Sequence, residues 1–173
     1  MTLNALSLSD VVLQSLVFLA KEQAETQSLV GMVIGEPPLL SATPVTTLSD
    51  IANVEWQRVS TTDFIELNFS QRFELAVLIL TGDCQIDTQN IQRCRDLFAK
   101  YCLVLQPVPI DSSTNQPLDM FSFGFSRFHE QVIPLLDNNY HIWQFNLFDY
   151  KHLPDWFNSK FWANPENWNK FRW

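Results

Sequence analysis

The stretch RFELAVLIL, residues 72–80, decides the fold class, because apolar residues fill it almost without interruption. A short run of this kind is typical of a strand buried on both faces in a parallel sheet. Residues 87–100, DTQNIQRCRDLFAK, then have helical spacing, with Asp87 as the expected N-cap and Cys94 on the apolar face. A further apolar run, CLVLQPV, follows at 102–108. The order strand, helix, strand predicts a βαβ unit.

The part of the chain before this unit also contains an expected helix followed by expected strands. Residues 9–25 have the apolar spacing of a helix, and Ser7 with Asp10 fits a capping box at its start. Residues 29–34 form a short apolar run that ends at glycine and proline, which predicts a second buried strand. Residues 54–59 alternate between apolar and polar side chains, and 44–48 is a further candidate strand.

The chain after the βαβ unit reads differently. A short helix is expected over residues 116–123. FSRFHEQV at 125–132 and YHIWQFNLFDY at 140–150 are expected strands around a turn at 137–139. Because the connection is so short, these two strands should pair antiparallel. The fold class is therefore α/β, a reduced Rossmann-like, mostly parallel sheet with a C-terminal antiparallel hairpin and an aromatic helical tail.

Bulk composition limits the function classes. At 173 residues, 46% apolar and 17% charged, a single domain over 1–173 is expected, with a body at 1–150 and a tail at 151–173. The formal net charge of -8 argues against nucleic-acid binding, because phosphate backbones repel an acidic surface. Three cysteines without metal or redox spacing, and no signal-peptide pattern, favour the cytoplasm. No apolar run approaches a membrane span, so no membrane partner is expected.

The order of elements resembles class I S-adenosylmethionine methyltransferases over roughly residues 26–150. VGMVIGEPP, from 30, resembles their first strand and cofactor loop. VEWQRVSTTDF, from 54, resembles their third strand followed by an acidic loop, and FELAVLIL, from 73, their fourth strand. GFSRFHEQ, from 124, and YHIWQFNLFDYK, from 140, resemble the closing hairpin. The resemblance implies a methyltransferase-like body.

The end of the chain carries a more specific resemblance. DYKHLPDWFNSKFWANPENWNKFRW, residues 149–173, is similar to the end of an uncharacterised family of short bacterial proteins known as a domain of unknown function. The body of those proteins is methyltransferase-like and has no established activity. Membership of that family therefore implies no substrate.

The chain departs from the methyltransferase pattern at the cofactor loop. Only Gly35 stands at the loop, because Gly31 falls inside the expected strand, and Pro37 and Pro38 lack backbone donors. Eight residues, 36–43, separate Gly35 from the candidate strand at 44–48, whereas a full crossover takes a dozen or more. The first crossover helix should therefore be lost or cut to one turn.

Residues that would contact a cofactor stand at strand ends, where open α/β sheets bind ligands. The candidates are Gly35, Glu36, Asp50, Asp63 and Asp83. The alternative for each is structural, since glycine and aspartate commonly end strands and occupy turns. No catalytic residue is assigned. S-adenosylmethionine is the cofactor only if the chain is a working methyltransferase, and otherwise no cofactor is expected.

Metal binding is not expected. His129 and His141 fall on the two strands of the expected hairpin and could face each other, but Glu130 points to the opposite face from His129. No spacing matches zinc ligation.

The tail is the least ordinary segment. Two Pro-started pieces predict short helices near 154–162 and 165–171. The aromatics expected to pack or to contact a partner are Trp156, Phe157, Phe161, Trp162, Trp168 and Trp173. Large aromatics favour burial, so the tail should cover apolar surface of the body. The alternative is a protein-binding surface, because tryptophan beside arginine or lysine marks interface hot spots.

These observations favour a methyltransferase-like protein without catalytic activity that acts through contacts with an unknown protein partner. The alternative is an S-adenosylmethionine-dependent methyltransferase with an atypical cofactor loop. The sequence leaves the oligomeric state open.

Overall fold

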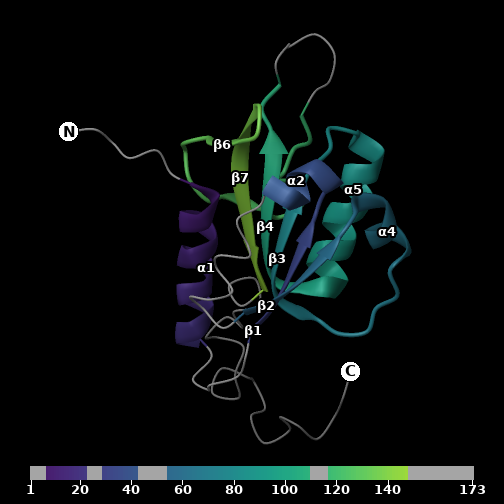
Figure 1. Ribbon diagram of the computed structural model, residues 1–173, viewed down its shortest axis with the longest axis vertical. Coiled ribbons are helices and arrows are strands. Elements are labelled where there is room, and N and C mark those ends of the chain that lie inside the picture. The colour runs from purple at the N-terminus through teal and green to yellow at the C-terminus, as the bar shows by residue number, and fades with distance from the viewer. Residues whose placement is uncertain (1–6, 23–28, 43–53, 110–116, 148–173) are drawn as a thin grey trace, which may run out of the picture.

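Figure 1 shows the chain in a computed structural model, in which residues 7–22, 29–42, 54–109 and 117–147 are described. The parallel part contains β1 (Leu29–Ile34), β2 (Val54–Val59), β3 (Phe73–Ile79) and β4 (Ala99–Pro107). The C-terminal part contains β5 (Ser126–Arg127), β6 (Ile133–Leu135) and β7 (Asn138–Asn146). The helices are α1 (Leu8–Glu22), α2 (Pro37–Ala42), α4 (Thr61–Glu66), α5 (Cys84–Arg93) and the π-helical turn η1 (Cys94–Phe98).

The strands of the described residues form one sheet in the order β2-β1-β3-β4-β7-β5, with β6 paired to β7. The neighbours among β1 to β4 are parallel, whereas β7 runs antiparallel to β4, β5 and β6. This arrangement confirms the predicted α/β fold, in which a mostly parallel, Rossmann-like sheet is completed by C-terminal antiparallel strands.

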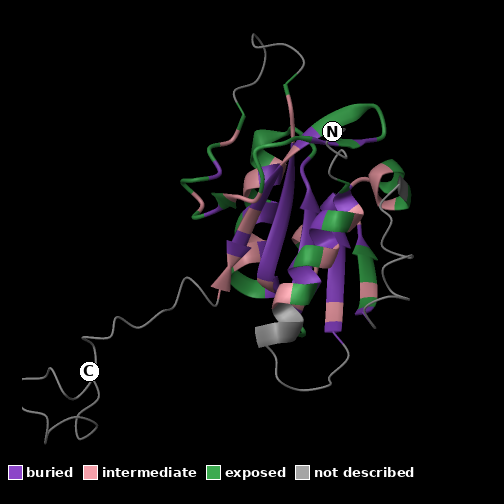
Figure 2. Cartoon of the chain, turned by 90° about the vertical axis from the view of Figure 1, so that its left-hand side faces the viewer, coloured by how far each residue is buried: buried purple, intermediate pink, exposed green. Residues whose placement is uncertain are grey.

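Helices cover both faces of the sheet, α1 on one side and α4 and α5 on the other (Figure 1). Along β3, Leu75, Val77 and Ile79 pack in the cluster that includes α1, whereas Ala76 and Leu78 pack in the cluster beneath α5. The strands are buried through the middle of the sheet, and α1 has a buried and an exposed stripe (Figure 2). Burial of β3 on both faces explains why its sequence is continuously apolar.

The capping box predicted at the start of α1 is confirmed. The Asp10 carboxylate accepts hydrogen bonds from the main-chain N–H and the hydroxyl of Ser7, and Ser7 Oγ accepts one from the Asp10 N–H. These bonds lower the pKa of Asp10, because they stabilise its charged form.

The predicted βαβ unit is present as β3, α5 with η1, and β4. Its helix starts earlier than predicted, because Asp83 is the N-cap and Asp87 lies inside α5. Asp83 accepts from the main-chain N–H groups of Gln85 and Ile86, which satisfies two donors at the helix start. The helix also ends earlier, in η1, so that Lys100 belongs to β4. Cys94 is buried as predicted, with its sulfur 3.7 Å from that of Cys102.

After β1 comes α2, which has six residues and begins at Pro37. Residues 43–53 of the crossover to β2 lie outside the described residues, so the shortened first crossover stays a prediction. Two details after it differ from the prediction. VEWQRV was assigned to a third strand, but as β2 it pairs directly with β1. The expected acidic loop after it is the helix α4, in which Asp63 lies in the first turn.

The C-terminal hairpin is also more broken than predicted. Of the expected strand over 125–132, only the two residues of β5 form a strand, and β6 follows beyond its expected end. Its turn with β7 falls at Leu136 and Asp137, one residue early, and Leu136 adopts a positive φ of 52°. Residues 117–123 form no helix, since Met120 to Gly124 make turns closed by main-chain hydrogen bonds.

Several predictions fall outside the described residues: the strand at 44–48, Asp50, the tail helices and all six tail aromatics. The packing of the tail on the body, and with it the single-domain organisation of 1–173, stays a prediction. Among the described helices, none is long and apolar enough to cross a membrane.

Candidate functional site

The strand order places a topological switch point between β1 and β3. The chain leaves β1 towards β2 on one side and then continues as β3 on the other. In open α/β sheets, ligands bind beyond the carboxyl ends of the strands at such a point. We call this end of β1 to β4 the carboxyl edge, and the opposite end the amino edge.

The two residues after β1 contact the end of β2. The N–H of Gly35 donates to the carbonyl of Val59 over 3.2 Å, and the Thr61 hydroxyl donates to a carboxylate oxygen of Glu36. Thr61 is only 1% exposed. A Cβ on Gly35 would stand 3.3 Å from Ile79, so this glycine permits close approach of β1 to β3. Glu36 therefore joins the loop after β1 to the start of α4 at the carboxyl edge.

The short helix α2 begins directly after Glu36 and limits which ligands the carboxyl edge can bind. The N-terminus of a crossover helix attracts phosphate through its free N–H groups. Here the first two helical residues are Pro37 and Pro38, which have no N–H, and the Leu40 N–H donates to the carbonyl of Glu36. This helix start is a poor anion cradle.

The loop after β3 is held by a buried carboxylate. Asp87, 2% exposed, accepts hydrogen bonds of 2.9 Å from the main-chain N–H groups of Thr81 and Gly82 and one of 3.0 Å from the Thr81 hydroxyl. Burial raises the pKa of Asp87, and the hydrogen bonds from Thr81 and Gly82 oppose that shift. Sequence reading took Asp87 for a cap and missed this role. The preceding Thr-Gly-Asp turn was the available signal.

Asp63 and Asp83 each complete a helix start. The Asp63 carboxylate accepts from the Ser60 hydroxyl at 2.6 Å, while Ser60 Oγ accepts from the Asp63 N–H. Asp83 caps α5. The register pairs Ile34 with Leu78, so the loop after β1 lies beside the loop after β3. The fold thus gathers Gly35, Glu36 and Asp83 at the carboxyl edge, and it places Asp63 beside them in α4.

On β7, His141 lies beside an arginine. Nδ1 of His141 contacts the Arg127 guanidinium, which also lies 5.0 Å from the centre of the Trp143 ring. Partial burial, together with this arginine, lowers the pKa of His141. Within the described part of the chain, no three metal-ligating side chains gather.

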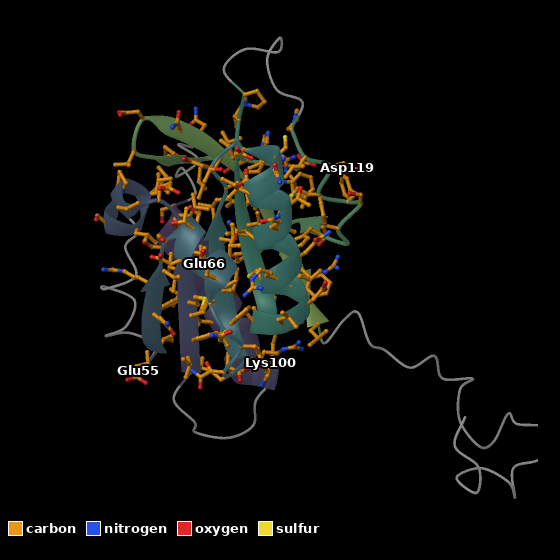
Figure 3. All side chains as sticks on the ribbon, turned by 90° about the vertical axis from the view of Figure 1, so that its right-hand side faces the viewer. Glu55, Glu66, Lys100 and Asp119 are labelled. Atoms are coloured by element: carbon orange, nitrogen blue, oxygen red, sulfur yellow. The ribbon has the colours of Figure 1, made fainter. Side chains whose placement is uncertain are left out.

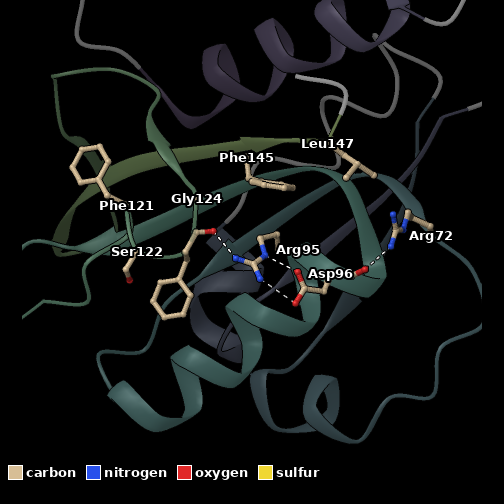
Figure 4. A pocket seen from close by; sticks show the side chains of 9 residues that line it. Arg72, Arg95, Asp96, Phe121, Ser122, Gly124, Phe145 and Leu147 are labelled. Atoms are coloured by element: carbon tan, nitrogen blue, oxygen red, sulfur yellow. Dashed lines mark hydrogen bonds and ion pairs between the residues drawn. The ribbon is translucent and has the colours of Figure 1, made fainter. Parts of the chain in front are cut away.

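A cavity of about 410 Å³ lies elsewhere, towards the amino edge (Figure 4). In Figure 3, Glu55 and Lys100 mark the amino edge, because they lie near the starts of β2 and β4. We call this cavity the amino-edge pocket. Its lining comes from the residue before β3, from η1, from the turn before β5 and from the end of β7, and consists of Arg72, Arg95, Asp96, Phe121, Ser122, Phe123, Gly124, Phe145 and Leu147.

The main chain holds both arginines of this pocket. Arg72 donates from Nε to the Leu97 carbonyl at 3.0 Å and from Nη2 to the Asp96 carbonyl. Arg95 donates from Nη1 to the Phe123 carbonyl at 2.6 Å and makes two hydrogen bonds to the Asp96 carboxylate. Figure 4 shows the Arg95 guanidinium between these two partners. Sequence reading missed the pocket, because its residues are far apart in the chain.

Comparison with known proteins gives a family and a distant structural match. A model described as a family of unknown function (DUF6231) matches residues 5–173. A solved structure of M. capricolum TrmK, in complex with the natural cofactor product S-adenosyl-homocysteine, matches 81% of this chain and 71% of that chain. The two are 10% identical, with a TM-score of 0.42. No curated protein matches.

Proposed function

Since the chain belongs to the DUF6231 family of unknown function, we propose from its geometry that it is a methyltransferase-like protein without catalytic activity, acting through protein contacts. The observation that carries this proposal is the bonding at the carboxyl edge. Glu36 is bonded to Thr61, Asp87 to Thr81 and Gly82, and Asp83 to the start of α5. These carboxylates already accept hydrogen bonds from the protein itself, which leaves less acceptor capacity for a cofactor.

The start of α2 supports the same proposal. A cofactor loop needs main-chain donors and close backbone approach, which glycines supply. Pro37 and Pro38 remove donors at the first turn after β1. The chain has four glycines in all, of which Gly35 and Gly82 stand at the carboxyl edge.

Protein contacts are assigned to the aromatic tail at 151–173. It carries four basic and two acidic side chains, whereas residues 1–150 carry 17 acidic and seven basic ones. Tryptophans beside lysine and arginine are enriched at interface hot spots. We place the protein in the cytoplasm, because its three cysteines match no disulfide or metal pattern.

A second candidate function is S-adenosylmethionine-dependent methyl transfer. The switch point between β1 and β3 favours it, together with Gly82. Gly82 has a φ of 92°, and no atom lies within 4 Å of where its Cβ would be. The loop after β3 therefore leaves space in front of its backbone.

Thermal unfolding with S-adenosylmethionine and with S-adenosylhomocysteine separates the two functions. A ligand at a hundred times its dissociation constant stabilises the folded state by about 2.7 kcal/mol, which is easily measured. We expect neither compound to raise the unfolding temperature. A saturable rise that Glu36→Gln weakens, and that the exposed control Glu66→Gln leaves intact, would overturn the non-catalytic proposal in favour of methyl transfer.

Proximity labelling tests the protein contacts. The full chain is compared with a Trp162→Ser/Trp168→Ser variant and with Val17→Ser, which changes an exposed residue of α1. We expect labelled partners to be lost in the tail variant and kept in the α1 variant. Identical labelling of all three chains would remove the tail from the proposed function.

A further inference from the structure

We propose that the amino-edge pocket binds a small organic monoanion, a carboxylate that carries an aromatic or branched apolar group. The carboxylate would face Arg72 and Arg95, and the apolar group would lie against the phenylalanines. This site is at the opposite end of the strands from the switch point, and the proposal does not depend on the function proposed above.

The size of the pocket suits a small ligand, and its walls combine polar and apolar groups. Ligand pockets measure about 300–1,000 Å³ and are mostly apolar, with a few placed polar groups. At about 410 Å³, the amino-edge pocket is near the lower end of that range. Three phenylalanine rings and Leu147 supply apolar surface, with Phe145 only 6% exposed and Phe121 66% exposed. The buried ring is a fixed floor and the exposed ring lies at the mouth.

The two guanidinium groups are positioned before any ligand arrives. Main-chain carbonyls of Asp96, Leu97 and Phe123 fix them, and main-chain positions vary less than side-chain rotamers. Among the described residues, Nη1 of Arg72 has no hydrogen-bond partner. A guanidinium held in place loses little entropy when it binds a carboxylate, and the planar fork matches that anion.

The charge of the lining selects a monoanion. Among the described residues that line the pocket, Arg72 and Arg95 are accompanied by one carboxylate, that of Asp96, so this lining has a formal charge of +1 within an acidic protein. A phosphate monoester would bring a second negative charge close to Asp96, which costs free energy. A carboxylate neutralises the pocket without that repulsion.

The π-helical turn η1 brings the charged residues together. The Ala99 N–H donates to the Cys94 carbonyl five residues back, which is the π pattern. This turn holds both Arg95 and its neighbour Asp96 in the pocket lining. Single π-helical turns are rare, and they occur frequently at functional sites. Their occurrence here agrees with a binding site.

Nuclear magnetic resonance titration of the full chain with four probes tests the proposal. Phenylacetate carries both groups, 2-phenylethanol lacks the charge, acetate lacks the ring, and phenyl phosphate carries the larger charge. We expect saturable shifts of the Arg95, Gly124 and Phe145 signals with phenylacetate, and at least about tenfold weaker binding of the other three. 2-Phenylethanol loses the charge-assisted contact, acetate loses the apolar contact with the phenylalanines, and phenyl phosphate brings a second negative charge close to Asp96.

Matched arginine variants sharpen the test. Arg72→Gln and Arg95→Gln should each weaken phenylacetate binding about tenfold, whereas Arg58→Gln, on an exposed position of β2, should leave it unchanged. Absence of saturation with phenylacetate overturns the proposal, as does equal binding of 2-phenylethanol or tighter binding of phenyl phosphate.

The chain itself is the competing occupant. Residues after Leu147 carry four tryptophans, and Leu147 lines the pocket. Nuclear Overhauser contacts in the free protein, between the Phe145 ring and an indole beyond residue 147, would assign the pocket to the chain and overturn the ligand proposal. Chemical-shift changes confined to the loops after β1 and β3 would instead indicate binding at the carboxyl edge, where the second candidate function is placed, and would overturn the pocket proposal.

Discussion

The carboxyl and amino edges of the same four parallel strands use charged side chains in different ways. At the carboxyl edge, the buried Asp87 is bonded to the adjacent loop, and Glu36 joins the loop after β1 to the start of α4. At the amino edge, Arg72 and Arg95 are anchored by carbonyls around an open cavity. Among the described residues, the carboxylates of the carboxyl edge bond neighbouring loops and helix starts, whereas the arginines of the amino edge also line a cavity.

Loss of the Asp87 carboxylate has the largest expected effect on stability. Asp87→Ala leaves the N–H groups of Thr81 and Gly82 without their acceptor. Hydrogen bonds to charged groups contribute about 1.5–3 kcal/mol, so the free energy of unfolding should fall by about 2 kcal/mol in urea denaturation. The control Gln89→Ala changes an exposed residue of the same helix and should stay within about 0.5 kcal/mol. An equal effect of both variants would refute the structural role of Asp87.

The pH dependence of stability gives a second, smaller effect of the same residue. Because the pKa of Asp87 is raised above 3.8, the folded state binds a proton before the unfolded state as pH falls. Its contribution is therefore fully present below pH 3.8 and is lost as pH rises through the folded pKa. Relative to Asp87→Asn, wild-type protein should gain stability on acidification through that window, measured by urea denaturation at several pH values. A difference that is independent of pH, or that shrinks on acidification, contradicts it.

Arg95→Gln should have the smallest effect on the unliganded protein. The Arg95 side chain is 25% exposed and its partner Asp96 53% exposed, so solvent screens the pair. Exposed ion pairs contribute about 0–1 kcal/mol, and we expect a loss of unfolding free energy below about 1 kcal/mol. A loss as large as that of Asp87→Ala would mean that the amino-edge arginines are structural too, and the contrast between the edges would fail.

Local patterns were sufficient for much of the fold. The apolar runs predicted β1 and β3 closely, and the alternation of apolar and polar residues at 54–59 predicted β2. The sequence prediction was wrong where two nearby residues fit the same motif equally well. Asp83 and Asp87 are both good N-caps by residue type, and only the position of the loop after β3 decides that Asp83 caps and Asp87 is buried.

The candidate site depends on contacts between residues that are far apart in the sequence. Gly35, Glu36 and Asp83 were predicted at the carboxyl edge because parallel strands end on one side, and the structure places them there. The bond from Thr61 to Glu36 joins residues 25 apart, and that from Arg95 to Phe123 joins residues 28 apart. No periodicity encodes such pairs.

By itself, the sequence determined the order of strands and helices along the chain and the aromatic composition of its end, because these follow from composition and spacing over a few residues. Only the tertiary structure decided which charged side chains hydrogen-bond to neighbouring loops and helix starts, and which line a cavity. That outcome depends on strand register and on the packing of η1 against the turn before β5, which bring together side chains from distant parts of the chain.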